Sequence, residues 1–308
     1  MNPRPFPPRR SAPSPATLRG PAPVCAAPRA PGWRGVLAVA LVFAVAAPSS
    51  ALADLMLYPT RIIISGAQRS AQVEIVNKGE KPETYRISIV NRRMNDTGDI
   101  VAADSPGPGD NFASDMLVHS PRQVTLQPGQ SQTVRVSVRR PADLAEGEYR
   151  SHLQFDRQPD LNAQNDLENL DGNGKPQVAV SLEALIGASI PVIVRQGQTQ
   201  AEVTLADLAL VPPSGAAPPM LSFVFRRQGN QSVYGDVVAT FTPAGGKPEE
   251  VGRVSGVAVY VPNSERRAQL PLRTPKGGVL RSGALRLTYS EQPSAGGKRL
   301  AEAQILLP

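Results

Sequence analysis

The sequence predicts an all-β protein that contains two β-sandwiches. After residue 53, apolar and polar residues alternate with a period of two, which places one face of a strand in a core and the other in water. Residues that favour turns separate these runs, and no segment shows a sustained helical period. A sandwich of short strands takes roughly 100 residues, so this length of chain provides for two sandwiches.

The first 53 residues differ from the rest of the chain in composition. They hold eleven of the 32 prolines, six arginines, the single Cys25 and the single Trp33, and they contain no acidic residue. An apolar run at residues 36–47 precedes Ala51-Leu52-Ala53. This order is typical of a signal peptide, and we expect cleavage between Ala53 and Asp54. A membrane anchor is the alternative, but the run is shorter than the roughly 20 residues of a membrane span.

Removal of this segment changes the charge balance. The remaining 255 residues hold 27 basic residues, because six of the 33 lie in the segment, and all 26 acidic ones, so the net charge falls from +7 to about +1. A general nucleic-acid-binding function then has no electrostatic basis. The remaining chain also has no cysteine, which excludes disulfides, thiolate metal sites and cysteine nucleophiles.

The first sandwich is expected over residues 54–196. Alternating runs predict strands in which every second residue faces the core: Ala71, Val73 and Ile75; Tyr85, Ile87 and Ile89; Val134, Val136 and Val138. Turns are predicted between the runs at residues 78–82, 95–98 and 127–129, where glycine and other turn-forming residues occur.

The second sandwich is expected over residues 197–308, after a polar stretch at residues 196–200. Alternation resumes beyond that stretch at residues 203–205, 221–225 and 285–289. Proline and glycine are frequent in this part of the chain, so we expect its strands to be weaker than those of the first sandwich.

One segment within the first domain is strongly polar. Residues 156–175 carry several acidic residues and an Asp171-Gly172-Asn173-Gly174 turn. A solvated loop is favoured over the alternative, calcium binding, because the acidic residues lack the spacing of an EF-hand.

Few residues of the chain suit catalysis. Only two histidines occur, His119 and His152, and the chain lacks the G-x-S-x-G, H-E-x-x-H and P-loop motifs. A serine or metal hydrolase would need one of these histidines beside a nucleophile or further metal ligands. We therefore expect no enzyme activity, no metal and no cofactor, with each histidine on a strand surface or in packing.

The run from Gln177 to Arg195 is much longer than an ordinary strand of about 5–6 residues. Its first apolar residues share one face: Val178, Val180, Leu182, Ala184 and Ile186. At a sheet edge, such a strand would offer unpaired backbone groups and apolar side chains to a partner's sheet. A fully buried central strand is the alternative, and periodicity alone does not separate the two.

Several segments between residues 55 and 196 follow an order that is found in a known family. They are LYPTRIIISG at 57–66, SPRQVTLQPGQSQTVRVSVRRP at 120–141, EGEYRSHLQF at 146–155 and the run at 177–195. In these segments the chain resembles the periplasmic pilus-assembly chaperones, the PapD-like family, whereas its second half matches only loosely. The resemblance implies two immunoglobulin-like β-sandwich domains with a subunit-binding cleft between them.

The resemblance also implies a site that anchors the carboxylate at the C-terminus of a subunit. Arg61 falls on the family's cleft arginine, and a guanidinium can hold a carboxylate through two parallel hydrogen bonds. The family's second anchor is a lysine, and Pro191 stands at that position here. Either Arg61 works alone, or another base such as Arg150 or Arg195 enters the cleft, or the carboxylate is held differently.

Three further residues match the family's interdomain ion pairs. Arg195 matches an arginine and Glu148 its acidic partner, and Glu291 is a loose match for the acid of the second domain. The resemblance implies that the three together fix the angle between the domains. If they are instead exposed strand charges, each contributes under about 1 kcal/mol.

The sequence and the resemblance together favour a periplasmic chaperone for pilus or fimbrial subunits. Val178, Val180, Leu182, Ala184 and Ile186 would fill the groove of a subunit that lacks its last strand. An outer-membrane usher is the second expected partner. The alternative is an exported two-domain adhesion or scaffold protein without chaperone activity; an exported hydrolase is the third class considered.

Overall fold

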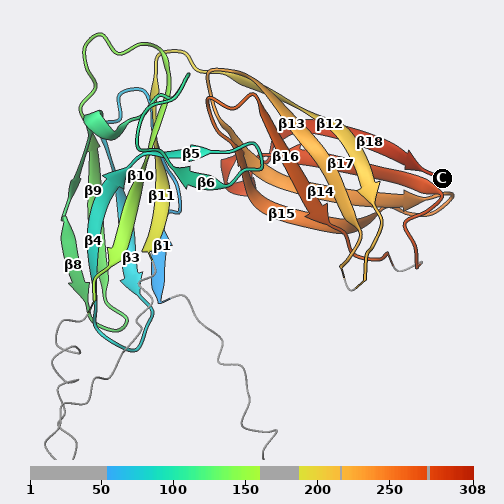
Figure 1. Ribbon diagram of the computed structural model, residues 1–308, viewed down its shortest axis with the longest axis horizontal. Helices are drawn as coiled ribbons and strands as arrows, with labels where there is room; N and C mark the ends of the chain where they lie inside the picture. Colours follow the sequence, from blue (N-terminus) through green and yellow to red (C-terminus); the bar gives the residue numbers. More distant parts are fainter. Residues whose placement is uncertain (1–53, 160–186, 216, 276–277) are drawn as a thin grey trace, which may run out of the picture. The chain divides into compact units, whose positions relative to one another are not determined.

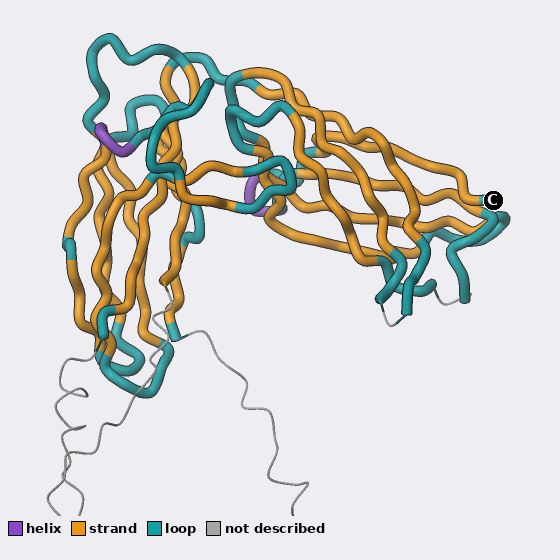
Figure 2. The backbone as a smooth tube through the Cα atoms, viewed as in Figure 1, coloured by secondary structure: helices purple, strands orange, loops and turns teal. Residues whose placement is uncertain are grey.

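The structure, a computed structural model, describes residues 54–159, 187–215, 217–275 and 278–308. The regular secondary structure of the described chain is almost entirely strand, with two short 3₁₀ helices, η1 (Ser114–Met116) and η2 (Pro293–Ala295) (Figures 1 and 2). Within these ranges, no helix has the length and apolarity to cross a membrane. The expected signal peptide and the predicted donor residues fall outside the described residues: Val178, Val180, Leu182, Ala184 and Ile186.

The first sandwich consists of two sheets and a hairpin. One sheet has the order β1 (Leu55–Tyr58), β3 (Ser70–Asn77), β9 (Ser131–Val138), β7 (Leu117–Ser120). The other has the order β2 (Ile62–Ile64), β11 (Gly187–Gln196), β10 (Gly147–Arg157), β4 (Glu83–Val90), β8 (Gln123–Leu126). The hairpin pairs β5 (Arg92–Met94) with β6 (Ile100–Ala102).

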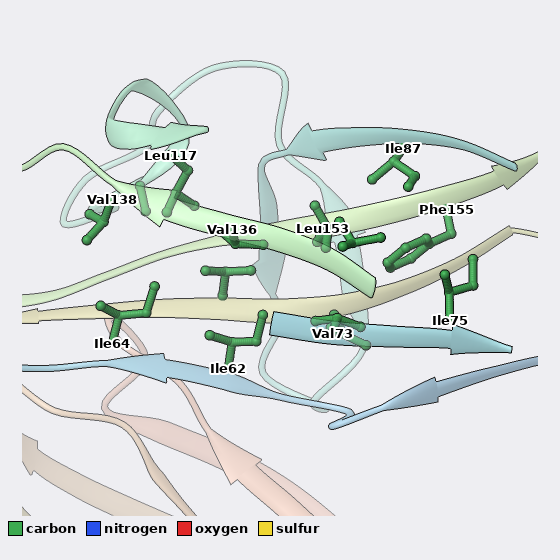
Figure 3. Packing of buried hydrophobic residues seen from close by; sticks show 14 of the residues in the cluster. Ile62, Ile64, Val73, Ile75, Ile87, Leu117, Val136, Val138, Leu153 and Phe155 are labelled. Carbon is green, nitrogen blue, oxygen red and sulfur yellow. The ribbon is translucent and has the colours of Figure 1, made fainter. Parts of the chain in front are cut away.

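The core of this sandwich follows the predicted alternation. Val73 and Ile75 of β3 are fully buried against Leu153 and Phe155 of β10, and Figure 3 shows these side chains between the strands. The intervening residues of β3, such as Glu74, are exposed. The strands predicted around residues 71–75, 85–89 and 134–138 are therefore confirmed as β3, β4 and β9.

The connectivity is that of an immunoglobulin-like sandwich. The strands β11, β10 and β4 lie side by side as the last, second-last and third strands of such a domain do. Near the start of β10, the hydroxyl of Tyr149 donates a hydrogen bond to the carbonyl of Ala145 at 3.0 Å. This bond from the penultimate strand back to the preceding turn resembles the tyrosine corner of immunoglobulin-like domains.

The described part of the long run, β11, lies inside its sheet. It pairs antiparallel with β10 along its whole length and parallel with β2 at Val192, Ile193 and Val194. Ile190, Val192 and Val194 are buried in the core. The strand therefore has a neighbour on both sides from Val192 to Val194, whereas residues 187–191 pair with β10 alone among the described strands.

The second sandwich also has two sheets. One has the order β12 (Ala201–Val211), β13 (Met220–Gly229), β16 (Glu265–Pro271). The other has the order β15 (Glu249–Val259), β14 (Val233–Pro243), β17 (Gly283–Ser290), β18 (Arg299–Leu307), which again is an immunoglobulin-like arrangement. The ring of Phe225 meets that of Tyr289 edge to face in the core, with centroids 5.0 Å apart.

The strands of the second sandwich are long although proline and glycine are frequent in this part of the chain. The strands β12 to β15 have 10 or 11 residues each. Glycine is accommodated by irregularities in the ladder rather than by short strands, since the register of β14 against β15 shifts between Gly235 and Val237. Prolines such as Pro243 stand at strand ends.

Candidate functional site

Arg61 and Arg150 of the first sandwich each stack on a tyrosine of the second. Arg61 directly precedes β2, and its guanidinium carbon lies 4.3 Å from the ring centroid of Tyr234. Arg150, on β10, lies 4.0 Å above the ring of Tyr260. We call these four residues the arginine–tyrosine cluster. Cation–π contacts of this kind contribute roughly 0.5–2 kcal/mol each, more when they are shielded from water.

The two arginines differ in the hydrogen bonds that they can still make. Arg150 is only 6% exposed, and its Nη2 donates to the carbonyl of Arg92 at 3.3 Å. Its Nε and Nη1 are buried without a partner among the described residues. For Arg61, only Nε is buried and unpartnered, and no described residue accepts a hydrogen bond from either terminal nitrogen. The two terminal nitrogens of Arg61, its guanidinium fork, are therefore free to bind a ligand, whereas the unused donors of Arg150 are buried.

Burial dominates the electrostatics of the cluster. It lowers the pKa of Arg61 from its ordinary value, while the neighbouring Tyr260 and Glu148 act in the opposite direction. Burial lowers the pKa of Arg150 as well. Because arginine stays protonated in proteins even so, the cluster presents two fixed positive charges in a partly dry environment, which favours an anionic partner.

Glu148 forms the polar link next to this cluster. Arg195 on β11 faces it across the ladder and donates from Nε to Glu148 Oε2 at 3.1 Å. Ser232 of the second sandwich donates to the same carboxylate twice, through its backbone N–H at 3.2 Å and through its hydroxyl. The Ser232 hydroxyl also accepts the N–H of Val261 at 3.0 Å. Glu148 is only 2% exposed, and both of its carboxylate oxygens accept hydrogen bonds from Arg195 or Ser232.

The structure brings together two of the three residues of the predicted interdomain cluster. Glu148 and Arg195 form an ion pair, while Glu291 lies just after β17. Among the residues that the structure describes, no ion pair or hydrogen bond joins the side chain of Glu291 to either of them. The second sandwich contributes the hydroxyl and amide of Ser232 at this point instead of an acid.

The β5–β6 hairpin provides a further contact between the sandwiches. Met94 packs in a small apolar group with Ile193, Ala258 and Tyr260. At its tip, the carbonyls of Met94 and Asn95 accept hydrogen bonds from the side-chain amide of Asn263, at 3.1 and 3.2 Å. The hairpin therefore packs against Tyr260, the residue on which Arg150 stacks.

Both histidines lie on strands of the first sandwich, His119 on β7 and His152 on β10. His152, two residues after Arg150 on β10, is buried, and its Nδ1 has no partner among the described residues. Burial, with the nearby charges of Arg150 and Arg92, lowers the pKa of His152 to about 3. The ring nitrogen of His119 lies 3.0 Å from the carbonyl of Ile87. Within the described ranges, no group of three or more potential ligands is arranged to hold a metal ion.

Sequence reasoning missed Ser232, Tyr234 and Tyr260. Their partners lie between 84 and 173 positions away in the chain, so no local pattern connects them. The only available signal was the scarcity of aromatic residues, because the chain has just six tyrosines and three of them, Tyr234, Tyr260 and Tyr289, stand near the ends of strands of the second sandwich.

Comparisons with known proteins give matches among solved structures only. No family model matches the chain, and no curated protein matches it. The chain is similar to the YadV chaperone, with 12% identity and a TM-score of 0.43 over 83% of this chain and 100% of that one. It is similar to the CupB2 chaperone of Pseudomonas aeruginosa, with 10% identity and a TM-score of 0.41 over 82% and 100%. A third similar structure is the SafB chaperone of Salmonella enterica in complex with the SafA pilin, with 15% identity and a TM-score of 0.40 over 83% and 97%.

Proposed function

We propose that this chain is a periplasmic chaperone that binds pilus or fimbrial subunits and donates a β-strand to their incomplete fold. The observation that carries the proposal is the open edge of β11. β10 pairs with β11 from Gly187 to Gln196, whereas β2 pairs with it only from Val192 to Val194. Among the described strands, residues 187–191 therefore have no partner on the β2 side.

An open edge of this kind can accept a further strand. Along the chain it leads directly back to residues 178–186, whose apolar face is predicted to fill the groove of a subunit. Each large aliphatic side chain that becomes fully buried contributes roughly 1.5–3 kcal/mol before the cost of ordering. Apolar burial would thus drive capture, and the proposal requires neither ATP nor a cofactor.

The position of Arg61 next to this edge supports the proposal that it binds the end of such a strand. Ile62, the first residue of β2, pairs with Val192, so Arg61 comes immediately before the point where the open edge closes. A subunit strand that runs along residues 187–191 in the direction of β11 would end beside Arg61. Its terminal carboxylate would accept two parallel hydrogen bonds from the free guanidinium fork.

The contacts favour Arg61 over the two other bases that the sequence suggested. Arg195 is engaged with Glu148. The unused donors of Arg150 are buried, so a carboxylate would reach them only after Tyr260 or its neighbours had moved. We therefore propose that Arg61 is the direct anchor, and that Arg150 adds positive charge without contact.

The remaining parts of the proposal come from the sequence. We propose domains over residues 54–196 and 197–308, location in the periplasm after cleavage at Ala53, and an outer-membrane usher as a second partner. The alternative is an exported adhesion or scaffold protein with the same sandwiches, which would not need an open strand edge beside a free guanidinium. Such a protein would not capture subunits. Capture is therefore the property to test.

The test is co-expression in the periplasm with candidate fimbrial subunits, followed by mass spectrometry of the proteins that copurify. We expect Arg61→Ala to weaken capture about ten- to a hundredfold, because a charge-assisted hydrogen bond contributes roughly 1.5–3 kcal/mol. Arg61→Lys should restore it only in part, since an ammonium lacks the fork. Arg226→Ala, which removes an exposed arginine of the second sandwich, is the matched control and should leave capture unchanged. Equal capture by Arg61→Ala and wild type would rule out the anchor.

A further inference from the structure

Tyr234 lies in the second sandwich, yet its ring stacks with an arginine of the first. It is the second residue of β14, and the guanidinium of Arg61 lies over its ring at 4.3 Å. The Tyr234 hydroxyl makes no hydrogen bond to any residue that the structure describes. The interaction of Tyr234 with Arg61 is therefore made through the face of its ring.

The backbone around Tyr234 is fixed from both sides. Two residues earlier, the amide and hydroxyl of Ser232 are bonded to Glu148. Two residues later, the carboxylate of Asp236 accepts the N–H of Gly256 at 3.0 Å. Gly256 has a φ of +73°, and a Cβ placed there would lie 2.8 Å from the Tyr234 hydroxyl. Only glycine both adopts that conformation readily and leaves space for the ring.

Stacking on an aromatic ring holds a guanidinium in place without occupying its N–H donors. The donors of arginine lie in the plane of the group, whereas an aromatic ring contacts its face. With Tyr234 on one face and Nε buried, the freedom of the long Arg61 side chain is restricted while its terminal fork stays free. Side chains that are ordered before binding lose less entropy when the ligand arrives.

From this geometry we infer that Tyr234 is a positioning residue for the carboxylate anchor: the second sandwich holds Arg61 in its binding orientation through the face of an aromatic ring. The inference rests on the proposed role of Arg61. It assigns to the second sandwich a part in recognition of the subunit's C-terminus, because an arginine without the ring would have to be ordered during binding. The ring is required and the hydroxyl is not.

The test compares binding of two peptides to the full chain after removal of residues 1–53. One is an acetylated hexapeptide of alternating threonine and valine with a free terminal carboxylate, and the other is the same peptide with a terminal amide. The ratio of their dissociation constants, followed by NMR titration, reports the carboxylate contact alone. The proteins are wild type, Tyr234→Phe, Tyr234→Leu, Tyr234→Met and Arg61→Ala.

We expect the amide to bind about tenfold more weakly than the acid for wild type and for Tyr234→Phe, which keeps the ring. The ratio should fall to about two for Tyr234→Leu and Tyr234→Met, and to one for Arg61→Ala. The Nε–H resonance of Arg61 should shift on loss of the ring in both non-aromatic variants and stay in place in Tyr234→Phe. Two non-aromatic variants are used so that the comparison can still be made if one of them fails to fold.

The outcomes separate the inference from the proposal beneath it. A ratio near ten that persists in both non-aromatic variants but is lost in Arg61→Ala would keep the anchor and overturn the role of Tyr234. A ratio of one in wild type would overturn the carboxylate anchor itself, and the positioning role with it. A loss in Tyr234→Phe equal to that in Tyr234→Leu would assign the effect to the hydroxyl and contradict the argument from the ring.

Discussion

Glu148 carries more contacts across the two sandwiches than any other acidic residue around the arginine–tyrosine cluster. Its carboxylate receives Arg195 and two donors of Ser232, and it is almost completely buried. Removing one partner of a buried pair leaves the other charge uncompensated, which costs about 3–5 kcal/mol. We expect Glu148→Ala to lower the free energy of unfolding by that amount in urea denaturation.

An exposed pair elsewhere provides the control for this variant. Arg226 contacts Asp207 and Glu265 at 2.9 and 3.3 Å, but all three side chains are more than half exposed. Exposed pairs contribute about 0–1 kcal/mol, so Arg226→Ala should leave the midpoint nearly unchanged. Equal effects of the two substitutions would show that Glu148 has no special role in joining the sandwiches.

His152 makes the stability of the protein depend on pH. Its pKa is about 3 in the folded chain, against an ordinary value of 6.5, because burial and two arginines oppose its protonation. The unfolded chain therefore binds more protons between these values, and stability falls as the pH drops from about 6.5 towards 3, by up to about 1.4 kcal/mol per unit.

Replacing His152 by an uncharged side chain tests this dependence. In His152→Gln, this contribution to the pH dependence should vanish, so the difference in unfolding free energy between pH 7 and pH 4.5 should be smaller than in wild type. Urea denaturation at several pH values measures the two slopes. Parallel slopes for variant and wild type would mean that His152 is protonated equally in both states.

At the scale of single residues, the sequence located Arg61, Glu148 and Arg195 through a resemblance, and it placed none of their tyrosine or serine partners. The reason is physical. The alternation of β2 or β10 depends on nearest neighbours, whereas the contact of Arg61 with Tyr234 depends on how two separately folded sheets meet. Glu291 shows the same limit, because a loose match in sequence did not reveal that Ser232 occupies the position facing Glu148.

At the scale of elements, the long run at residues 177–195 contains β11 and, before it, the residues proposed to be donated, and substitutions can test the two parts separately. Val192 is fully buried between β10 and β2, so Val192→Ser removes buried carbons and buries a hydroxyl. This should lower the free energy of unfolding by roughly 2–5 kcal/mol. Val180 and Leu182 are the proposed donor residues, and a donor side chain adds nothing to the protein's own core, so Val180→Ser and Leu182→Ser should leave the midpoint near that of wild type.

Chemical denaturation of the three isolated variants decides between donor strand and core before any subunit is known. Val192→Ser serves as the internal standard for a buried position of the same run. Drops for Val180→Ser and Leu182→Ser as large as that for Val192→Ser would place those residues in the protein's own core and refute their donation to a partner.

Strands were the most predictable elements of the chain. The runs at residues 71–75, 134–138, 221–225 and 285–289 alternate because one face of each strand meets a core, and this pattern is local. The length of the strands in the second sandwich did not follow from the sequence, because the effect of glycine depends on whether a bulge is available. Gly235 lies at such an irregularity, which no count of glycines reveals.

At the scale of the whole molecule, the sandwiches have separate apolar cores and share few but specific contacts. The cores contain different residues. The contacts between the sandwiches include those of Glu148 with Ser232, the arginine–tyrosine cluster, the apolar group around Met94, and the bonds of the β5–β6 hairpin to Asn263 and Arg267. In the function that we propose, the first sandwich presents an open strand edge and the second orders the residue at the end of that edge.

The most direct test of the proposed function is to measure the amount of soluble fimbrial subunit that accumulates in the periplasm with and without the chain. We predict that a subunit lacking its last strand is insoluble or degraded alone, and that it is recovered in a one-to-one complex when the chain is co-expressed. Leu182→Ser should reduce this recovery sharply although the variant itself stays folded, because a hydroxyl would enter an apolar groove and leave part of it unfilled. Recovery of the subunits at the same level without the chain, or no complex with any of them, would contradict the proposed function.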